Sequence, residues 1–369
     1  MNNTKLAMSH YFSLYLDFVR FIAALAVFFD HITSYPFTKG FFWDPLGSFG
    51  GIAVIIFFVL SGYVIAYVTS TRETTAARYA SARIARIYSV VFVALAITLV
   101  FDNIGSYINP EFYAIQKVMW KPQSIEGYVS SLFFVNEYQA FNFNGISPGS
   151  NGPYWSLSFE VTYYVIAGLF LFANRIFALP AIAALLFLGG NTIAALFPVW
   201  ILGYLLYCVS MERVSKSLVY TLFIISIFLI ATTPILASHL PNDNFGFEFP
   251  WGRGPFNRNL IKDYLPAIFF AVNLLCAKEI LMKFDFKLNA KFELLIRWLG
   301  SLTFPLYLIH FPALALFSSI SPYSNNTASN ALFISLLTLS LVIIATPITD
   351  RLKIKMKQKL TPALERCKK

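Results

Sequence analysis

Long runs of apolar residues, separated by short polar segments, follow one another along almost the whole chain. A helix needs about 20 apolar residues to cross a hydrocarbon core of about 30 Å. The runs that reach this length lie near residues 12–34, 50–69, 83–101, 153–173, 217–238, 262–282, 297–319 and 329–349. This pattern predicts an all-α polytopic membrane protein.

One further apolar region lies between Arg175 and Glu212 and is interrupted by Gly189, Gly190 and Asn191. It is too long for one span and a little short for two, so it is interpreted as two short spans or a re-entrant hairpin. Either arrangement returns the chain to the side that it left. With two short spans, about ten transmembrane helices are expected.

The composition agrees with a membrane protein. Hydrophobic residues make up 57% of the 369 residues and charged residues 12%, whereas a soluble domain carries roughly 25% charged residues. These values exclude a disordered chain and an ordinary cytosolic enzyme. The cysteines, Cys208, Cys276 and Cys367, have no paired spacing and no His cluster nearby, so neither a disulfide framework nor a metal site is predicted.

The positive charges indicate the orientation, because cytoplasmic loops of membrane proteins collect Lys and Arg. With the N-terminus inside, about 21 of the 28 Lys and Arg residues fall in inner segments. Both termini are therefore expected in the cytoplasm, and the net charge of +10 does not indicate a nucleic-acid partner. We expect one transmembrane domain over 1–350 and a basic, helical tail over 351–369 at an anionic leaflet of the bilayer.

Two long outer loops, 102–152 and 239–261, combine aromatic side chains with amide groups, and the second also carries arginine. Aromatic faces and amide groups suit sugar rings, which present both C–H faces and hydroxyls. The same residues also favour turns, so the loops could simply cover the helix ends. Both interpretations stay open.

Ionisable residues inside a predicted span are candidates for function, because each costs at least about 2.5–3.5 kcal/mol to insert. Arg20 and His31 lie in the first span, eleven residues apart. Eleven residues are close to three helical turns, so both side chains project from nearly the same face, roughly 16 Å apart. Asp17, three residues before Arg20, can hold its guanidinium. The alternative is an arginine that snorkels inward and a histidine at the headgroup level.

Two further ionisable residues lie in later spans. Glu160 is expected roughly 9–12 Å below the outer surface, a depth at which it could meet His31. A carboxylate beside an imidazole fixes the tautomer and stabilises the imidazolium, which is the usual arrangement of a general base. His310 could face the same cavity, although a hydrogen bond to the backbone of a neighbouring helix is favoured.

The second and third spans contain small or basic residues with two interpretations each. Ser61 and Gly62 interrupt a bulky run, which suits close helix packing as well as a direct role. Arg83 and Arg86 lie on one helix face at the inner end of the third span. Their planar forks suit phosphate oxygens, and anchoring to lipid headgroups is the competing interpretation.

These motifs together resemble the membrane-integral acyltransferase family 3. Asp17, Arg20 and His31 match its first-helix pattern of an Arg, ten residues and a His. The segments FFVLSGY, WSLSFE and LYLIH are similar to later family motifs, as is the pair Arg83 and Arg86. The motif residues among these segments are Ser61, Gly62, Trp155, Ser156, Glu160, Tyr307 and His310. The resemblance covers about residues 14–320.

The resemblance implies an O-acyltransferase of the bacterial inner membrane. Such an enzyme moves an acyl group, here expected to be acetyl, from cytoplasmic acyl-CoA to a hydroxyl of an extracytoplasmic or lipid-linked glycan such as O-antigen or exopolysaccharide. His31 would then be the general base, oriented by Glu160, and Arg20, Arg83 and Arg86 would bind the CoA. Acetyl-CoA or another acyl-CoA would be a cosubstrate, with no permanently bound cofactor.

Two questions stay open at this stage. The acyl group could pass directly to the acceptor or through an acylated His31 or Ser61. The chain could also be a transporter or flippase of a lipid-linked glycan, for which charged residues in the membrane and sugar-binding loops are equally expected. Transporters often consist of repeated halves, and the sequence shows no such repeat.

Overall fold

The computed structural model describes residues 8–33, 37–38, 49–115, 123–141, 145–240, 260–283 and 287–366. Within these ranges the chain is helical and has no β-strand, as the apolar runs predict. The helices are α1 (His10–Thr33), α2 (Gly50–Thr71), α3 (Ala76–Ile108), α4 (Pro110–Ile115), α5 (Ile125–Leu132), α6 (Trp155–Phe172), α7 (Arg175–Gly189), α8 (Asn191–Leu206), α9 (Lys216–Ser238), α10 (Leu260–Met282), α11 (Ala290–Ser319) and α12 (Ala328–Arg366). Two short 3₁₀ turns, η4 (Gln139–Phe141) and η5 (Gly152–Tyr154), lie between α5 and α6. Most of the predicted loop 239–261, as well as Cys367, lies outside the described residues.

Eight of the described helices are long and apolar enough to cross a membrane, and each overlaps one of the eight predicted runs. α3 continues to Ile108, so the expectation of a loop from residue 102 onward is wrong for its first residues. The region between Arg175 and Glu212 forms the two shorter apolar helices α7 and α8. They meet at Gly190, whose φ of +86° favours glycine. A Cβ at this position would also lie 2.0 Å from Oε1 of Gln139, so the glycine is required for the turn between the two helices.

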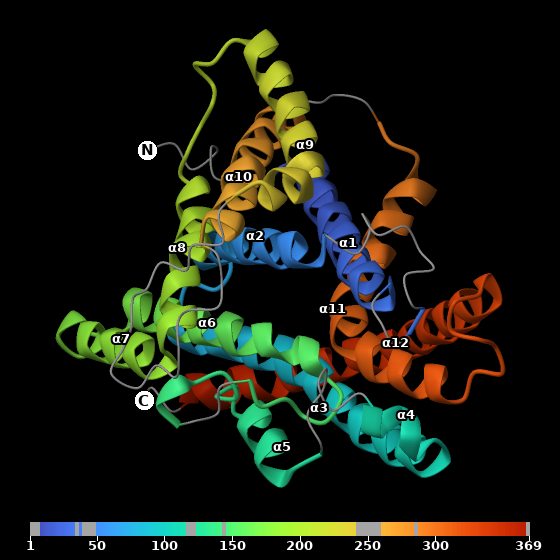
Figure 1. The fold of residues 1–369 in the computed structure, drawn as a ribbon. Helices are drawn as coiled ribbons and strands as arrows, with labels where there is room; N and C mark the ends of the chain where they lie inside the picture. Colours follow the sequence, from blue (N-terminus) through green and yellow to red (C-terminus); the bar gives the residue numbers. More distant parts are fainter. Residues whose placement is uncertain are drawn as a thin grey trace.

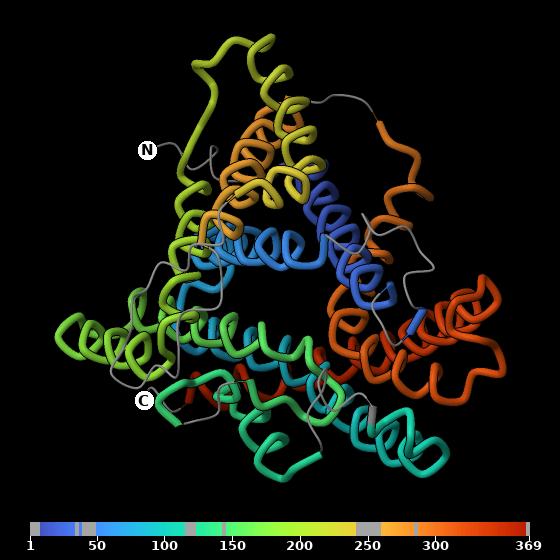
Figure 2. The backbone as a smooth tube through the Cα atoms, in the orientation of Figure 1, coloured from blue at the N-terminus to red at the C-terminus, as the bar shows by residue number. Residues whose placement is uncertain are grey.

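The helices pack as a set of neighbouring pairs (Figure 1). The closest pairs are α1 with α11, α12 with α3, α2 with α8, and α10 with α9. Figure 2 shows α7 extending away from the rest of the bundle. Helices far apart in the sequence are therefore brought together, above all the first with the eleventh and the third with the twelfth.

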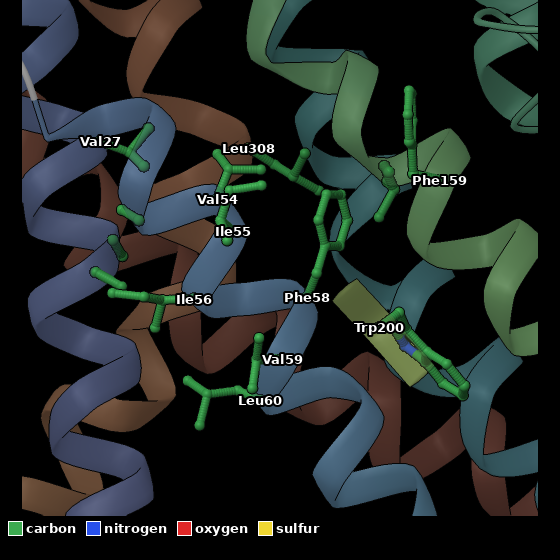
Figure 3. Packing of buried hydrophobic residues seen from close by; sticks show 14 of the residues in the cluster. Val27, Val54, Ile55, Ile56, Phe58, Val59, Leu60, Phe159, Trp200 and Leu308 are labelled. Carbon is green, nitrogen blue, oxygen red and sulfur yellow. The ribbon is translucent and has the colours of Figure 1, made fainter. Parts of the chain in front are cut away.

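Apolar side chains from helices throughout the bundle fill the interior, and Figure 3 shows part of this cluster. Val27 of α1, Ile55 of α2 and Leu308 of α11 are all fully buried or nearly so. Phe58 of α2 stacks on Phe159 of α6 with the ring centroids 6.1 Å apart. Within this core α2 packs against α1, α8 and α10, and it also contacts α6.

α2 and α8 touch backbone to backbone at a pair of glycines. A Cβ on Gly62 would lie 2.0 Å from the carbonyl oxygen of Trp200, and one on Gly203 would lie 2.0 Å from that of Val59. Small residues allow such an approach between membrane helices. The structure therefore supports the packing interpretation of Gly62.

The last part of the loop 102–152 is tied to two helices just before α6 begins. The carboxylate of Asp102 on α3 accepts hydrogen bonds from the backbone N–H and the hydroxyl of Ser150, at 2.7 and 2.6 Å. The side-chain amide of Asn151 donates to the carbonyl oxygen of Leu308 on α11 at 2.9 Å. These bonds fix the first turn of α6 against α3 and α11.

The predicted tail over 351–369 is helical as far as Arg366 and continues α12 without a break. It packs along the first turns of α3 (Figure 1). The hydroxyls of Thr361 and Ser81 lie 2.9 Å apart, and Arg78 pairs with Glu365 at 3.2 Å. This extension of α12, residues 351–366, therefore packs against the rest of the protein, while its position at an anionic leaflet stays a prediction.

The glycine contact gives a first test. Replacing Gly62 by Ala should lower the free energy of unfolding by about 1–3 kcal/mol, because the added methyl forces α2 and α8 apart. Thermal unfolding of the purified protein in detergent measures the loss. Gly51→Ala is the matched control on the same helix, since a Cβ there meets nothing within 4 Å. Equal stability of the two variants would contradict the close contact.

Candidate active site

A cavity of about 570 Å³ lies between α1, α2, α3, α6, α11 and α12. Its volume falls in the range of about 300–1,000 Å³ that is usual for ligand sites. Along α2 its lining extends from Val54 to Arg72, which corresponds to about 27 Å at 1.5 Å per residue. The cavity therefore runs along most of the length of a membrane span.

The two ends of this cavity differ in chemistry. One end, called the basic end here, is lined by Arg72, Glu73, Lys353 and Lys357. It contains the turn between α2 and α3, which the charge pattern predicts on the cytoplasmic side. The other end, called the closed end, is lined by Ser156 and Tyr307.

Cations outnumber carboxylates along the cavity. The charged lining residues are Arg20, Arg72, Arg83, Arg86, Lys353, Lys357, Glu73, Glu160 and Asp350. A cleft with such an excess of one sign attracts ligands of the opposite sign. The cavity is thus suited to an anionic ligand that enters at the basic end.

Asp17 holds Arg20 as the sequence predicts, and it also joins two helices. Nη1 of Arg20 lies 3.4 Å from Oδ1 of Asp17. The other carboxylate oxygen accepts a hydrogen bond from Arg297 on α11, which also donates to the hydroxyl of Ser13 at 2.8 Å. A Cβ on Gly300 would approach the Cβ of Asp17 to 2.9 Å, so α1 and α11 are in close contact at this carboxylate.

The structure separates the roles of Arg83 and Arg86. Nη2 of Arg83 donates to both carboxylate oxygens of Glu73, at 2.8 and 3.0 Å. Both side chains of this ion pair are only 11% exposed. The side chain of Arg86 forms no ion pair or hydrogen bond with any described residue, and it lines the same cavity as Arg20. The guanidinium of Arg86 is therefore the one whose donors are available to a ligand.

Glu160 lies in the cavity wall and has partners other than the expected ones. Its carboxylate accepts hydrogen bonds from the hydroxyl of Tyr164, one turn further along α6, and from that of Ser61 at 3.5 Å. Ser61 in turn accepts from the indole N–H of Trp200 at 3.1 Å. Glu160 therefore does not orient His31 as expected, because the imidazole of His31 bonds to a side chain of α11.

His31 is paired with His310. Nδ1 of His31 lies 2.9 Å from Nε2 of His310, and the two rings stack with their centroids 5.1 Å apart. Nδ1 of His310 lies 2.8 Å from the carbonyl oxygen of Leu306 in its own helix. The expected bond of His310 to a neighbouring helix backbone is therefore wrong: it bonds to the backbone of α11 itself and to the first-span histidine.

These contacts determine the neutral tautomers of both rings. A carbonyl oxygen only accepts, so Nδ1 of His310 carries the proton and Nε2 of His310 is an acceptor. His31 must then donate from Nδ1, which leaves the lone pair of its neutral imidazole on Nε2. This assignment follows from the hydrogen-bond network, and it places the basic nitrogen of the pair on His31.

A layer of side chains separates the cavity from the histidine pair. The cavity lining includes neither His31 nor His310. The hydroxyl of Tyr307 lies 2.6 Å from that of Ser156 and 3.2 Å from the carbonyl oxygen of Pro153. Tyr307 precedes His310 by three residues, a rise of about 4.5 Å, so it lies between the cavity and the imidazoles.

The remaining motif residue, Trp155, packs beside this layer. Its ring meets that of Phe159 edge to face, with the centroids 5.1 Å apart. This contact positions the first turn of α6, which also carries Ser156. The structure thus brings most of the predicted motif residues to one cavity or to its closed end.

The sequence was compared with known protein families, curated proteins and solved structures. It matches the acyltransferase domain family over residues 13–349, which is most of the chain. The chain belongs to acyltransferase family 3. As a member of this family with many apolar helices, it is a multi-pass membrane acyltransferase. Neither the curated proteins nor the solved structures gave a match.

Several residues at the site of this family 3 acyltransferase were not recognised from the sequence. They are Glu73, Tyr164, Arg297, Lys353 and Lys357. Tyr164 had a local signal, because it follows Glu160 by one helical turn. The others come from a turn or from helices distant in sequence, so only the packed structure shows them at the cavity or beside Asp17.

The contrast between the two arginines of α3 gives a second test. Arg83→Gln leaves the nearly buried carboxylate of Glu73 without its partner and should cost about 3 kcal/mol of stability. Arg86→Gln removes the same charge three residues along the helix and should cost about 0.5 kcal/mol or less. Thermal unfolding in detergent compares the two variants.

The double variant Glu73→Gln/Arg83→Gln serves as the control for this comparison. It removes both charges, and it should regain part of the stability that Arg83→Gln loses. Equal losses in Arg83→Gln and Arg86→Gln would contradict a structural role that is specific to Arg83.

Proposed function

We propose that this acyltransferase moves an acyl group, with acetyl as the expected one, from acyl-CoA on the cytoplasmic side of the bacterial inner membrane to a glycan. The acceptor is a hydroxyl of an extracytoplasmic or lipid-linked saccharide. The observation that supports the proposal most is the long cavity with cations at one end and an imidazole pair just beyond the other.

The donor fits the length and charge of the cavity. The pantetheine arm of CoA is about 15–20 Å long when extended, by the bond geometry that also sets chain reach. Arg20 and His31 are about 16 Å apart along α1. With the pyrophosphate near Arg20 and Arg86, the thioester therefore reaches the level of the histidines. Cationic side chains with available donors suit the phosphate oxygens.

The chemistry is a direct transfer in this proposal. Nε2 of His31 takes the proton of the acceptor hydroxyl, and the hydroxyl oxygen attacks the thioester carbonyl. The carbon–sulfur bond then breaks, and CoA leaves as a thiolate that takes up the proton. His310 accepts a hydrogen bond from the imidazolium of His31 in place of the carboxylate expected from the sequence.

The closed end supplies two further functions. The hydroxyls of Ser156 and Tyr307 are donors at the boundary between cavity and imidazoles, where an oxyanion forms as the acceptor attacks. Their mutual hydrogen bond has to open before the thioester reaches His31. Movement of Tyr307 away from Ser156 and from the carbonyl oxygen of Pro153 thus admits the donor and frees both hydroxyls.

The assignment of His31 and its partner gives a third test. His31→Ala should lower kcat by about 10²- to 10⁴-fold, the usual contribution of a general base, while CoA binding stays unchanged. His310→Gln should displace the acidic limb of the pH–rate profile, because it alters the group that bonds to His31. Glu160→Gln should leave that limb in place. A displaced limb in Glu160→Gln alone would restore the carboxylate as the partner of His31.

The overall activity is tested with the purified protein in detergent. Incubation with acetyl-CoA labelled in the acetyl group and with a glycan acceptor should place the label on the glycan as an alkali-labile ester. Mass spectrometry of surface glycans from a strain without this protein should show the loss of one ester. Translocation of a lipid-linked glycan in vesicles without ester formation would instead indicate a transporter.

A further inference from the structure

The cavity of this protein has a wall that none of the sequence motifs includes. Lys353 and Lys357, in the extension of α12, line its basic end. They are four residues apart, so they project from the same side of the helix. Lys355 and Lys359 alternate with them along the chain and do not line the cavity. The extension therefore places Lys353 and Lys357 at the cavity and Lys355 and Lys359 outside its lining.

The position of this wall is fixed by contacts with α3. The pairs Thr361 with Ser81 and Arg78 with Glu365 hold the extension along the helix that carries Arg86. The extension is also continuous with the membrane part of α12, whose Thr349 lines the same cavity. Lys353 and Lys357 thus belong to a defined surface and are held beside the arginines.

Both lysines are available to a ligand. Lys353 pairs with Asp350 at 2.5 Å, but both side chains are more than a third exposed, and such pairs contribute only about 0–1 kcal/mol. Lys357 is exposed and forms no ion pair with any described residue. A dianionic group can therefore displace Asp350 at little cost and bind between the two ammonium groups.

We propose that Lys353 and Lys357 bind the 3′-phosphate at the nucleotide end of the acyl-CoA donor. This inference rests on the proposed function and extends it. In extended CoA the thioester comes first, then the pantetheine arm, then the pyrophosphate, and last the nucleotide with its 3′-phosphate. With the thioester toward the closed end, the outermost phosphate lies at the basic end, where the exposed lysines are.

The test measures binding of free CoA and of 3′-dephospho-CoA to the purified full-length chain in a neutral detergent. The unaltered protein should bind CoA about tenfold more tightly, as expected for two exposed charge contacts of about 0.7 kcal/mol each. In Lys353→Gln/Lys357→Gln the two ligands should bind equally. Lys355→Gln/Lys359→Gln, with the same loss of charge on the same helix, should keep the tenfold preference.

The outcomes separate this inference from the function on which it rests. If the unaltered protein binds neither ligand, the proposed donor is wrong and the inference fails with it. If it binds both ligands equally, or if the preference survives in Lys353→Gln/Lys357→Gln, only the role of the lysines fails. Lys357→Gln alone changes one exposed residue, and it replaces the double variant if that variant does not fold. It should lower the tenfold preference for CoA to about threefold.

Lipid phosphate offers the same chemistry as the 3′-phosphate, and a second arm distinguishes them. Binding of the detergent-solubilised protein to phosphatidylglycerol vesicles is measured for the same two double variants. Equal vesicle binding by both supports the donor as the ligand of Lys353 and Lys357. Weaker vesicle binding by Lys353→Gln/Lys357→Gln, with the CoA preference intact, would assign these lysines to the lipid surface and overturn the proposal.

Discussion

A charge among apolar helices costs several kcal/mol unless a partner or water reaches it, and the packing of this acyltransferase follows from that constraint. Asp17 is shared by Arg20 and Arg297, which draws α11 against α1. The charge of Arg83 is paired with that of Glu73, from the turn before α3. The charges without such partners, above all Arg86, line a cavity that a ligand or water can enter.

The histidine pair changes the chemistry expected at the outer end of the first helix. A carboxylate partner would stay charged beside an imidazolium, whereas His310 is a neutral acceptor fixed by Leu306. A neutral partner avoids a permanent charge at a place where the helices are tightly packed. Glu160 instead accepts hydrogen bonds from Ser61 and Tyr164 in the cavity wall. Its charge there offsets part of the excess of cations.

The sequence predicts the helices well because twenty apolar residues carry a strong local signal. It also predicts that Arg20 and His31 share a helix face, since helical periodicity alone decides this. It does not predict which helix faces His31, because that depends on the packing of α1 against α11 through small residues such as Gly300. For the same reason the sequence places Lys353 only in a basic tail at the bilayer surface. Its position at the cavity depends on the packing of this tail along α3.

Because α12 is one continuous helix, the number of residues near Asp350 determines where the rest of the helix lies. Each residue turns a helix by about 100°, so a one-residue insertion there rotates everything that follows relative to the membrane part of α12. An insertion of about seven residues restores the direction but shifts the extension by about 10 Å along its axis. The number of residues in this segment therefore sets both the direction and the distance at which the following side chains are placed, and it matters as much as their identity.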